Sequence, residues 1–324
     1  LAGRPQRHHR RKKSRVPNVG FNPLGEFLAT HNDPCYFHEF ATRAAGQGLA
    51  YLGETELRSS LPEAMPAETG GLIRKIAGDD GLALEQYMDF FGGRQFRRSL
   101  LVRADQRARV SRAIRADRLT GLHLASSLRE GAPEKAGDPI PFADEGARLM
   151  VCDPLSLGLY RFLQAAWPDT RTPDEIRNHL VQAGVLRGDS ASADFLRFLM
   201  SPVVGGTVRI ARQVRRLGRA DDPRPEIWPM ARLQLAQEQP WVASQLHKVV
   251  KIKDDNARFL ALVDGTRDHA ALAATLADML LDGRLKSDLP DGVGRDQLLP
   301  ECQRLVQQSL DLCQRQAILK SDDS

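Results

Sequence analysis

Histidine and cysteine side chains gather in one short stretch of this chain, where they could bind a metal ion. His31, Cys35 and His38 recur at intervals of four and three residues. However, Pro34 begins a predicted helix between them, and no second ligand pair follows at the interval of a zinc site. His38 also begins a His-Glu-x-x-Thr sequence, in which Thr42 stands where a zinc protease has its second histidine. We therefore expect these residues to cap or pack elements and predict no metal site.

Two other groups of reactive side chains lack the partners that chemistry would need. Tyr87 and Asp89 lie on one predicted helix without an acid/base partner at a readable spacing, so we interpret them as a core aromatic and a solvated or capping carboxylate. Arg212, Arg215 and Arg216 could bind phosphate, but acidic residues follow at 221, 222 and 226. That mixture of charges is typical of a solvated surface.

Glycine-rich cofactor motifs are missing from the sequence. A nucleotide-binding domain of the doubly wound α/β type needs glycines in the turn after its first strand, because the backbone approaches the cofactor closely there. Gly292-Val293-Gly294 has no third glycine and follows Pro290 rather than a strand. Walker A, G-x-S-x-G and H-E-x-x-H sequences are also absent. We predict no catalytic and no cofactor-binding residue in this chain.

The stretch from Asp33 to Glu54 predicts a helix followed by a strand. Asp33 is the expected N-cap, Pro34 suits the first helical position, and Gly48 suits a left-handed C-cap. The predicted helix is Pro34 to Gln47, and the predicted strand is Leu49 to Leu52.

Four aromatic residues of this stretch, Tyr36, Phe37, Phe40 and Tyr51, fall within sixteen positions of a chain with only 6% aromatic residues. Such a concentration indicates a contact surface, part of which must be local core. We predict these four residues as candidate interdomain contacts. We expect Tyr36 or Phe40 to be more exposed than a core residue, and the chain to self-associate or bind a hydrophobic dye. The alternative is complete burial of all four rings within the chain.

The spacing of apolar residues and the positions of glycine, proline and capping residues predict a helix-rich α+β fold for the rest of the chain. The expected elements are a short helix at Leu24–Leu28, helices at Leu82–Phe91, Gln106–Arg118, Pro173–Ala183 and Met230–Glu238, and strands at Phe96–Val102, Leu122–Leu128 and Ala147–Cys152. Asp254 to Leu281 should form two helices separated at Gly265, with Thr266 as the second N-cap. The pattern of the C-terminal part is that of a winged helix. Its other expected elements are a strand at Leu246–Ile252, a loop at 283–294, a last long helix and a final strand at Ala317–Leu319.

Three segments of the sequence resemble a known family. They are Gln86-Tyr87-Met88-Asp89-Phe90, then Arg94-Gln95-Phe96-Arg97-Arg98-Ser99-Leu100-Leu101, then Leu262-Val263-Asp264-Gly265-Thr266-Arg267-Asp268. The chain is similar to the part downstream of the catalytic domain in rickettsial-type protein-lysine methyltransferases, which are bacterial class I S-adenosylmethionine methyltransferases. The similarity extends over most of 23–281 and is weakest in the middle third.

The resemblance implies a domain organisation and a function. We expect a basic tail at 1–20, a mixed helical and small-sheet methyltransferase regulatory domain at 21–131, a helical middle region at 132–229 and a winged-helix-like domain at 230–324. The implied function is the non-catalytic regulatory and substrate-positioning part of a protein methyltransferase that acts on lysine. S-adenosylmethionine would bind the catalytic domain, and the partners would be that domain and a protein substrate. The chain begins at Leu1 rather than at a methionine, and we expect it to be a fragment whose transferase domain is truncated away or encoded separately.

The distribution of charge keeps a second function open. The formal net charge is +5, but seven of the 46 basic side chains lie within residues 1–20, where there is no acidic residue. This arm could bind a polyanion, so the alternative is a nucleic-acid-binding winged-helix protein with a basic N-terminal arm. The predicted recognition helix argues against that alternative, because it carries Asp268, Asp278 and Asp282 around an alanine-rich centre.

The cysteines and the hydropathy pattern favour a cytoplasmic location. Cys35, Cys152, Cys302 and Cys313 show no C-x-x-C spacing and are too sparse to cross-link a chain of 324 residues. No apolar run approaches the roughly 18 residues of a membrane-spanning helix, and no apolar segment of a signal peptide follows the basic N-terminus.

Overall fold

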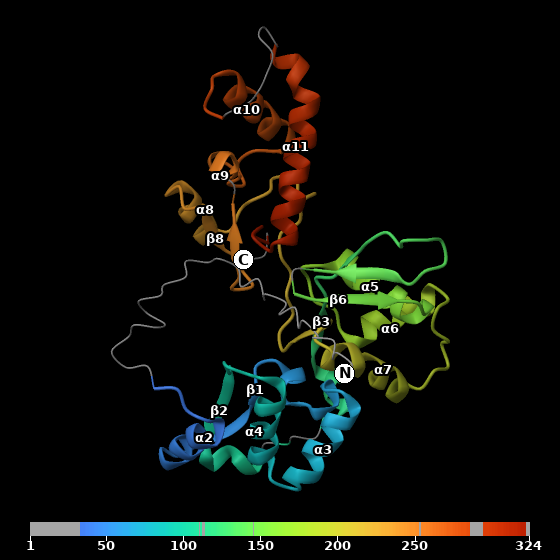
Figure 1. Ribbon diagram of the computed structural model, residues 1–324. Coiled ribbons are helices and arrows are strands. Elements are labelled where there is room, and N and C mark those ends of the chain that lie inside the picture. Colours follow the sequence, from blue (N-terminus) through green and yellow to red (C-terminus); the bar gives the residue numbers. More distant parts are fainter. Residues whose placement is uncertain are drawn as a thin grey trace, which may run out of the picture. The chain divides into compact units, whose positions relative to one another are not determined.

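The computed structural model describes residues 33–109, 111, 114–144, 146–252, 254–285 and 294–321. Among these, one compact unit contains 33–53 and 65–109, and a second contains 54–64 and the residues from 111 onwards (Figure 1). The expected basic tail and the expected helix at Leu24–Leu28 lie outside the described residues. None of the helices in the described ranges is long and apolar enough to cross a membrane.

The first unit packs helices beside a two-stranded sheet (Figure 1). Its elements are α2 (Phe37–Gly46), β1 (Leu49–Glu54), α3 (Ala67–Ala77), α4 (Gly81–Gly92), β2 (Ser99–Arg103) and the 3-10 helix η3 (Ala104–Arg109). Strand β1 pairs with β2, and both α2 and α3 contact α4. Helix α4 therefore forms the centre of the unit.

Helix α2 begins three residues later than the sequence predicted. The Glu39 carboxylate accepts a hydrogen bond from the Tyr36 backbone N–H at 2.8 Å, so Tyr36 rather than Asp33 is the N-cap. A carboxylate at the third helical position can satisfy an N-terminal donor in this way, and it fixes where the helix starts. Gly48 has a φ of +72°, as expected of a residue in the left-handed region after a helix.

Helix α4 confirms one prediction, and the segments after it correct two. The Asp80 carboxylate accepts hydrogen bonds from the N–H groups of residues 82 and 83, and Gly93 ends the helix with a φ of +61°. Strand β2 begins at Ser99 rather than at Phe96, whose side chain is 83% exposed. The continuous helix predicted from Gln106 to Arg118 is wrong. Its charged sequence offers no apolar stripe to bury, and the described part forms short 3-10 turns.

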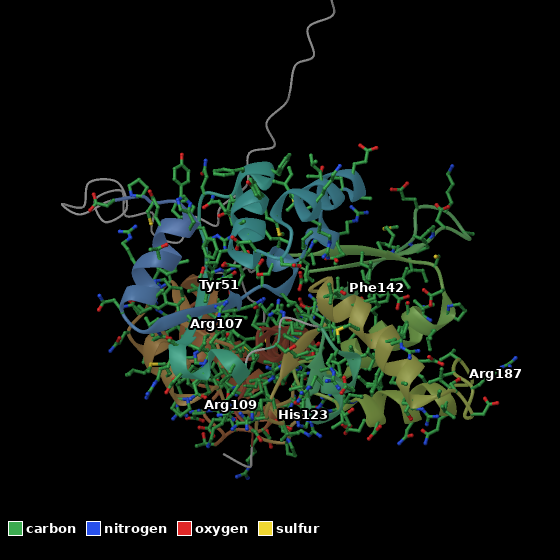
Figure 2. All side chains as sticks on the ribbon, turned by 90° about the horizontal axis from the view of Figure 1, so that it is seen from below. Tyr51, Arg107, Arg109, His123, Phe142 and Arg187 are labelled. Atoms are coloured by element: carbon green, nitrogen blue, oxygen red, sulfur yellow. The ribbon has the colours of Figure 1, made fainter. Side chains whose placement is uncertain are left out.

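The N-terminal half of the second unit holds two small antiparallel sheets and three helices. Its elements are η1 (Leu57–Ser60), η2 (Pro62–Ala64), η4 (Ala116–Gly121), β3 (His123–Ala125), β4 (Arg129–Glu130), β5 (Ile140–Ala143), β6 (Arg148–Val151), α5 (Pro154–Ala166), α6 (Pro173–Gln182), α7 (Ser192–Val204) and β7 (Arg209–Ala211). The order of one sheet is β4-β5-β6, and β3 pairs with β7 in the other. Phe142, fully buried, lies in the apolar core, whereas Arg187 lies at the periphery (Figure 2).

A local capping signal in this half marks the start of helix α6, which the sequence predicted at Pro173–Ala183. Helix α6 has the capping box expected of its sequence, in which the Thr172 hydroxyl accepts from the Glu175 N–H at 3.1 Å and the Glu175 carboxylate accepts from the Thr172 N–H at 2.6 Å. Strands β4 and β5 pair on either side of Gly131, and the two compact units divide near residue 110, while the domain boundary at 131 stays a prediction. The boundaries at 20 and 229 stay predictions.

The C-terminal part of the second unit has the helices and hairpin of a winged helix. Its elements are α8 (Pro229–Ala236), β8 (Trp241–Ala243), β9 (Val249–Lys251), α9 (Asp254–Leu260), α10 (His269–Leu281) and α11 (Arg295–Arg315). Strands β8 and β9 form an antiparallel hairpin, α10 packs along α11, and Leu319 forms a bridge with Ile227 (Figure 1). The helix-rich α+β fold is confirmed. The expected wing at 283–294 lies largely outside the described residues.

The connection between α9 and α10 contains the predicted glycine turn. Gly265 has a φ of +80°, and the two helices on either side of it are present as predicted. The N-cap of α10 is Asp268, not Thr266, because the Asp268 carboxylate accepts from the Ala271 N–H at 2.8 Å. The Thr266 hydroxyl instead donates to the Asp264 carboxylate at 2.5 Å, which stabilises the turn.

Candidate functional site

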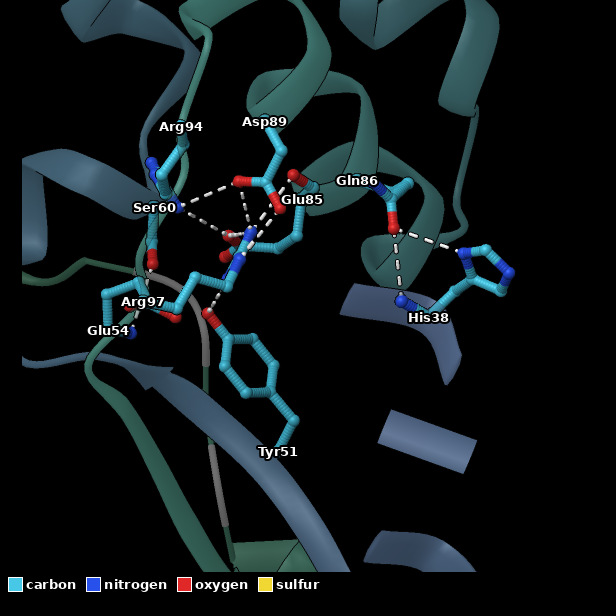
Figure 3. A network of polar contacts seen from close by, with 9 residues as sticks. All are labelled: His38, Tyr51, Glu54, Ser60, Glu85, Gln86, Asp89, Arg94 and Arg97. Atoms are coloured by element: carbon cyan, nitrogen blue, oxygen red, sulfur yellow. Dashed lines mark hydrogen bonds and ion pairs between the residues drawn. The ribbon is translucent and has the colours of Figure 1, made fainter. Parts of the chain in front are cut away.

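A partly buried cluster of charged side chains lies in the first unit, where Glu85 is buried and Asp89 and Arg97 are partly exposed (Figure 3). The Arg97 guanidinium donates to Asp89 through two nitrogens, at 2.8 and 2.9 Å, and to the Glu85 carboxylate at 3.1 Å. It also donates to the Glu85 carbonyl at 3.0 Å and to the Tyr51 hydroxyl at 3.4 Å. Its central carbon lies 3.8 Å from the centre of the Phe37 ring. One side chain thus connects α4, β1 and α2.

The arrangement follows from the spacing of the two acids. Glu85 and Asp89 are four residues apart on α4 and share one face, where their charges would repel if nothing lay between them. Arg97 bridges them, and Arg94 adds a second guanidinium 3.3 Å from Asp89. The planar guanidinium donates along several directions at once, which suits this role better than a lysine would.

Burial and charge act on Arg97 in opposite directions. Burial alone lowers the pKa of Arg97, but the hydrogen bonds that Arg97 donates to Asp89 and the charges of Asp89 and Glu85 raise that pKa above its ordinary value. Arg97 is therefore always a cation here. Since the Glu85 side chain is only 2% exposed, loss of Arg97 would leave a buried carboxylate with weaker compensation. The expectation of a solvated or capping Asp89 is wrong, because tertiary packing places Arg97 against it.

Aromatic rings surround this cluster and reach the surface. Phe37 and Tyr51 are buried and meet edge to face, with ring centres 4.7 Å apart. Tyr36 is 57% exposed and meets Phe90, 56% exposed, with ring centres 5.7 Å apart. Phe96 also exposes most of its ring. Exposed rings held by packed neighbours are typical of surfaces that bind other proteins.

A groove of about 570 Å³ joins the charge cluster to these rings. Three of the four predicted contact residues, Tyr36, Phe37 and Phe40, line it, together with Arg97 and Phe90. Tyr51 lies beneath, in contact with Phe37. The structure brings the predicted residues together, but Phe37 and Tyr51 are core and Phe40 is partly buried, so of the four only Tyr36 is exposed. Their role as an interdomain contact stays a prediction.

Sequence reasoning missed the residues that organise this site. Glu85, Asp89 and Arg97 belong to it, and Phe90 extends it to the surface. The acids at four-residue spacing before two arginines were a usable signal, although not one that indicates which arginine turns inward. His38 is also part of the surroundings, since its backbone N–H donates to the Gln86 side-chain oxygen at 3.1 Å.

The site presents aromatic rings beside arginine side chains. No set of three or more His, Cys, Asp or Glu residues among those the structure describes could hold a metal ion, and His31 lies outside those residues. The two carboxylates and the guanidinium satisfy one another. The remaining chemistry is that of an aromatic and cationic surface for a partner.

Two family models match the chain, one in each unit. Residues 24–103 match the family described as "Predicted methyltransferase regulatory domain", and residues 223–318 match "PKMT, C-terminal winged helix domain". The chain therefore carries a methyltransferase regulatory domain followed by a winged-helix domain of the PKMT type, and the resemblance predicted from the sequence is confirmed. The aromatic groove and the charge cluster both lie in the regulatory domain.

Two solved structures and one curated protein from Rickettsia are similar to this chain. Two structures of PKMT2 from Rickettsia typhi, one of them in complex with AdoHcy, superpose with TM-scores of 0.76 and 0.73 at 19% and 20% identity. Each comparison covers 92% of this chain and 60% of the other. The uncharacterized protein RP789 of Rickettsia prowazekii (strain Madrid E) is 28% identical over 113 residues, which are 35% of this chain and 20% of that protein. At these identities the two structures establish a shared fold.

Proposed function

We propose that this chain is the regulatory and substrate-positioning part of an S-adenosylmethionine-dependent protein-lysine methyltransferase. In this proposal it acts together with a class I methyltransferase domain that supplies the cofactor site and the chemistry. The observation that carries the proposal is the pair of family matches, regulatory domain first and winged helix last, on a chain whose fold follows rickettsial PKMT2 over 92% of its length. The lack of a glycine-rich cofactor turn in the sequence is consistent with this division of labour.

The groove of the regulatory domain is the proposed contact with the methyltransferase domain. Tyr36 and Phe90 are each more than half exposed, and aromatic residues beside arginines often dominate the binding energy of protein interfaces. The charge cluster beneath them fixes α4 against β1 and α2, so the rings are held in place before the partner binds.

Charge pairing in the winged helix disfavours the nucleic-acid alternative. Helix α10 contains no arginine or lysine. The nearby Arg267, Arg284 and Arg295 each lie within 3.3 Å of a carboxylate, those of Asp264, Asp282 and Asp278 respectively. A duplex would have to displace these acids to gain phosphate contacts.

The proposal is tested by adding this chain to the methyltransferase domain encoded with it or beside it in the genome. Transfer of labelled methyl groups to lysines of a protein substrate should rise at least tenfold in kcat/KM when the chain is present. Titration calorimetry of the chain alone with S-adenosylmethionine should show no saturable binding. Saturable binding at micromolar cofactor by the chain alone, or methyl transfer that is indifferent to the chain, would contradict the proposal.

Variants of the groove locate the contact. Tyr36→Ser with Phe90→Ser should weaken association with the methyltransferase domain at least tenfold in sedimentation velocity. Trp241→Ser, which removes another exposed aromatic from the second unit, is the matched control and should leave association unchanged. Equal effects of the two variants would rule out this groove as the contact.

A further inference from the structure

Strand β6 is an open edge of its sheet. The sheet order is β4-β5-β6, so β6 pairs with β5 on one side only. No other backbone or side-chain hydrogen bond among the described residues involves the backbone of residues 148–152. In an antiparallel pair, alternate residues direct their N–H and C=O groups away from the neighbouring strand, so about half of these groups on β6 have no strand to pair with.

A groove of about 630 Å³ runs along this edge. Six successive residues, Arg148 to Asp153, line it. Successive side chains of a strand point to opposite faces, and a cavity that all of them border must therefore follow the edge of the strand rather than one face. The volume is within the range of sites that bind ligands in proteins.

The floor and far wall of the groove come from helices α5 and α7. Leu159 and Tyr160 of α5 are buried and form an apolar floor, and Phe198 and Pro202 of α7 line the opposite wall. The Tyr160 hydroxyl is already engaged with the Thr207 hydroxyl at 2.6 Å. The side chains of an added strand would therefore meet apolar surface, while its backbone would meet the open edge of β6.

Two arginines give the groove a positive charge. Arg58 and Arg148 both line it, both are exposed, and neither forms an ion pair with a described residue. The one acidic side chain of the lining, Asp153, caps α5 by accepting from the Ser156 N–H at 2.7 Å. The groove thus favours an acidic occupant over a basic one.

We propose that this groove binds an extended, acidic segment of a partner polypeptide, which adds to the sheet as a fourth strand beside β6. Backbone hydrogen bonds to β6 supply the pairing, apolar side chains of the segment rest on α5 and α7, and its carboxylates approach Arg58 and Arg148. The proposal concerns binding alone and does not depend on the proposed methyl transfer.

A labelled heptapeptide of alternating glutamate and valine, capped at both ends, tests the pairing on the unaltered protein. Fluorescence anisotropy should show saturable binding. N-methylation of the peptide at one set of alternate residues should weaken its affinity for the protein at least tenfold. N-methylation of the other set should change that affinity less than threefold. No saturable binding, or equal losses for the two sets, would overturn the proposal.

The exposed thiols of Cys152 and Cys35 report where the peptide binds. Cys152 lines the groove, and Cys35 lies in the other unit. Saturating peptide should slow alkylation of Cys152 at least fivefold and leave that of Cys35 unchanged. Unchanged alkylation of Cys152 would place the peptide elsewhere and refute the site.

Charge reversal tests the preference for acidic segments. Arg148→Glu should weaken binding of the glutamate peptide at least tenfold at low salt. Arg187→Glu is the matched control, since Arg187 is exposed in the same unit and lies outside the groove (Figure 2). Equal losses for the two variants would show that only net charge matters and would contradict the proposed site.

Discussion

The regulatory domain and the winged-helix domain have interiors of opposite character. The regulatory domain has a small apolar cluster around Phe37, Ala41 and Tyr51, and it buries Glu85 and Gln86 in the same unit. Among its described residues, the winged helix buries many apolar side chains from all of its helices, Leu272 among them, and a single polar one, Ser244. Apolar burial stabilises without direction, whereas a charge cluster holds elements in one geometry and tolerates little change. The first domain therefore depends on directed contacts between charged groups, and the second depends on apolar burial.

The largest effect is expected from removal of the central cation. Arg97→Met should destabilise the regulatory domain by about 3–5 kcal/mol, because Glu85 and Asp89 then share a buried site without their bridge. Hydrogen exchange of the full chain should show the loss as faster exchange in α4 and β1, with the winged helix unchanged.

A surface pair provides the control for that experiment. Arg103 pairs with Asp105 at 2.9 Å, and both side chains are mostly exposed, so Arg103→Met should cost no more than about 1 kcal/mol. Replacing Glu85, Asp89 and Arg97 together by apolar residues should recover much of the lost stability. If Arg97→Met and Arg103→Met have similar effects, the cluster does not hold the domain together.

The winged-helix domain should instead be destabilised by a cavity in its apolar core. Leu272→Ala, at a fully buried position of α10, should cost about 3 kcal/mol through lost burial and the cavity left behind. The measurement is urea unfolding with hydrogen exchange to assign the loss to α10 and α11. Leu281→Ala, at an exposed position of the same helix, should have little effect, and a similar cost at both positions would argue against the described core.

The turn before α10 should give a smaller, pH-dependent effect. Burial alone raises the pKa of Asp264, but hydrogen bonds from Thr266 and the charge of Arg267 lower it below its ordinary value. The stability this carboxylate contributes is therefore complete above the unfolded-state pKa of about 3.9 and is lost as pH falls through the lower folded-state pKa. Asp264→Asn should cost about 1–2 kcal/mol near pH 7.

The pH dependence of unfolding distinguishes a contribution of the Asp264 charge from a simple loss of packing. The difference in unfolding free energy between Asp264→Asn and the unsubstituted chain should stay constant from about pH 7 to pH 5 and shrink below about pH 4. Asp311→Asn, on α11, is a control for a general change of charge. A difference that persists at low pH would mean that the charge of Asp264 contributes nothing.

The smallest effect on stability is expected at the exposed rings. Tyr36→Ser with Phe90→Ser should change the unfolding free energy by about 1 kcal/mol or less, since both rings are more than half exposed. The same pair should reduce the binding of a hydrophobic dye and any self-association of the chain, which Trp241→Ser should not do. Unchanged dye binding would remove the support for a contact surface at this groove.

The sequence alone determined the features that depend on neighbours along the chain. The helix that starts at Pro173, the helix predicted at Leu82–Phe91 and the two helices flanking Gly265 all follow from residues within one or two turns of each other. These features depend on neighbours in the sequence, so periodicity, caps and glycines predicted them. The family resemblance was likewise readable, because it rests on short contiguous segments.

Tertiary structure decided everything that depends on which surfaces meet. Tyr36 and Phe37 are adjacent in sequence, yet the first is exposed and the second buried, because α4 and β1 cover only one side of α2. Asp89 was expected in solvent and lies against Arg97 for the same reason. The open edge of β6 also exists only once the sheet order is fixed. The helical period of apolar residues predicts which face of a helix is buried. It does not predict which residues from the rest of the protein pack against that face.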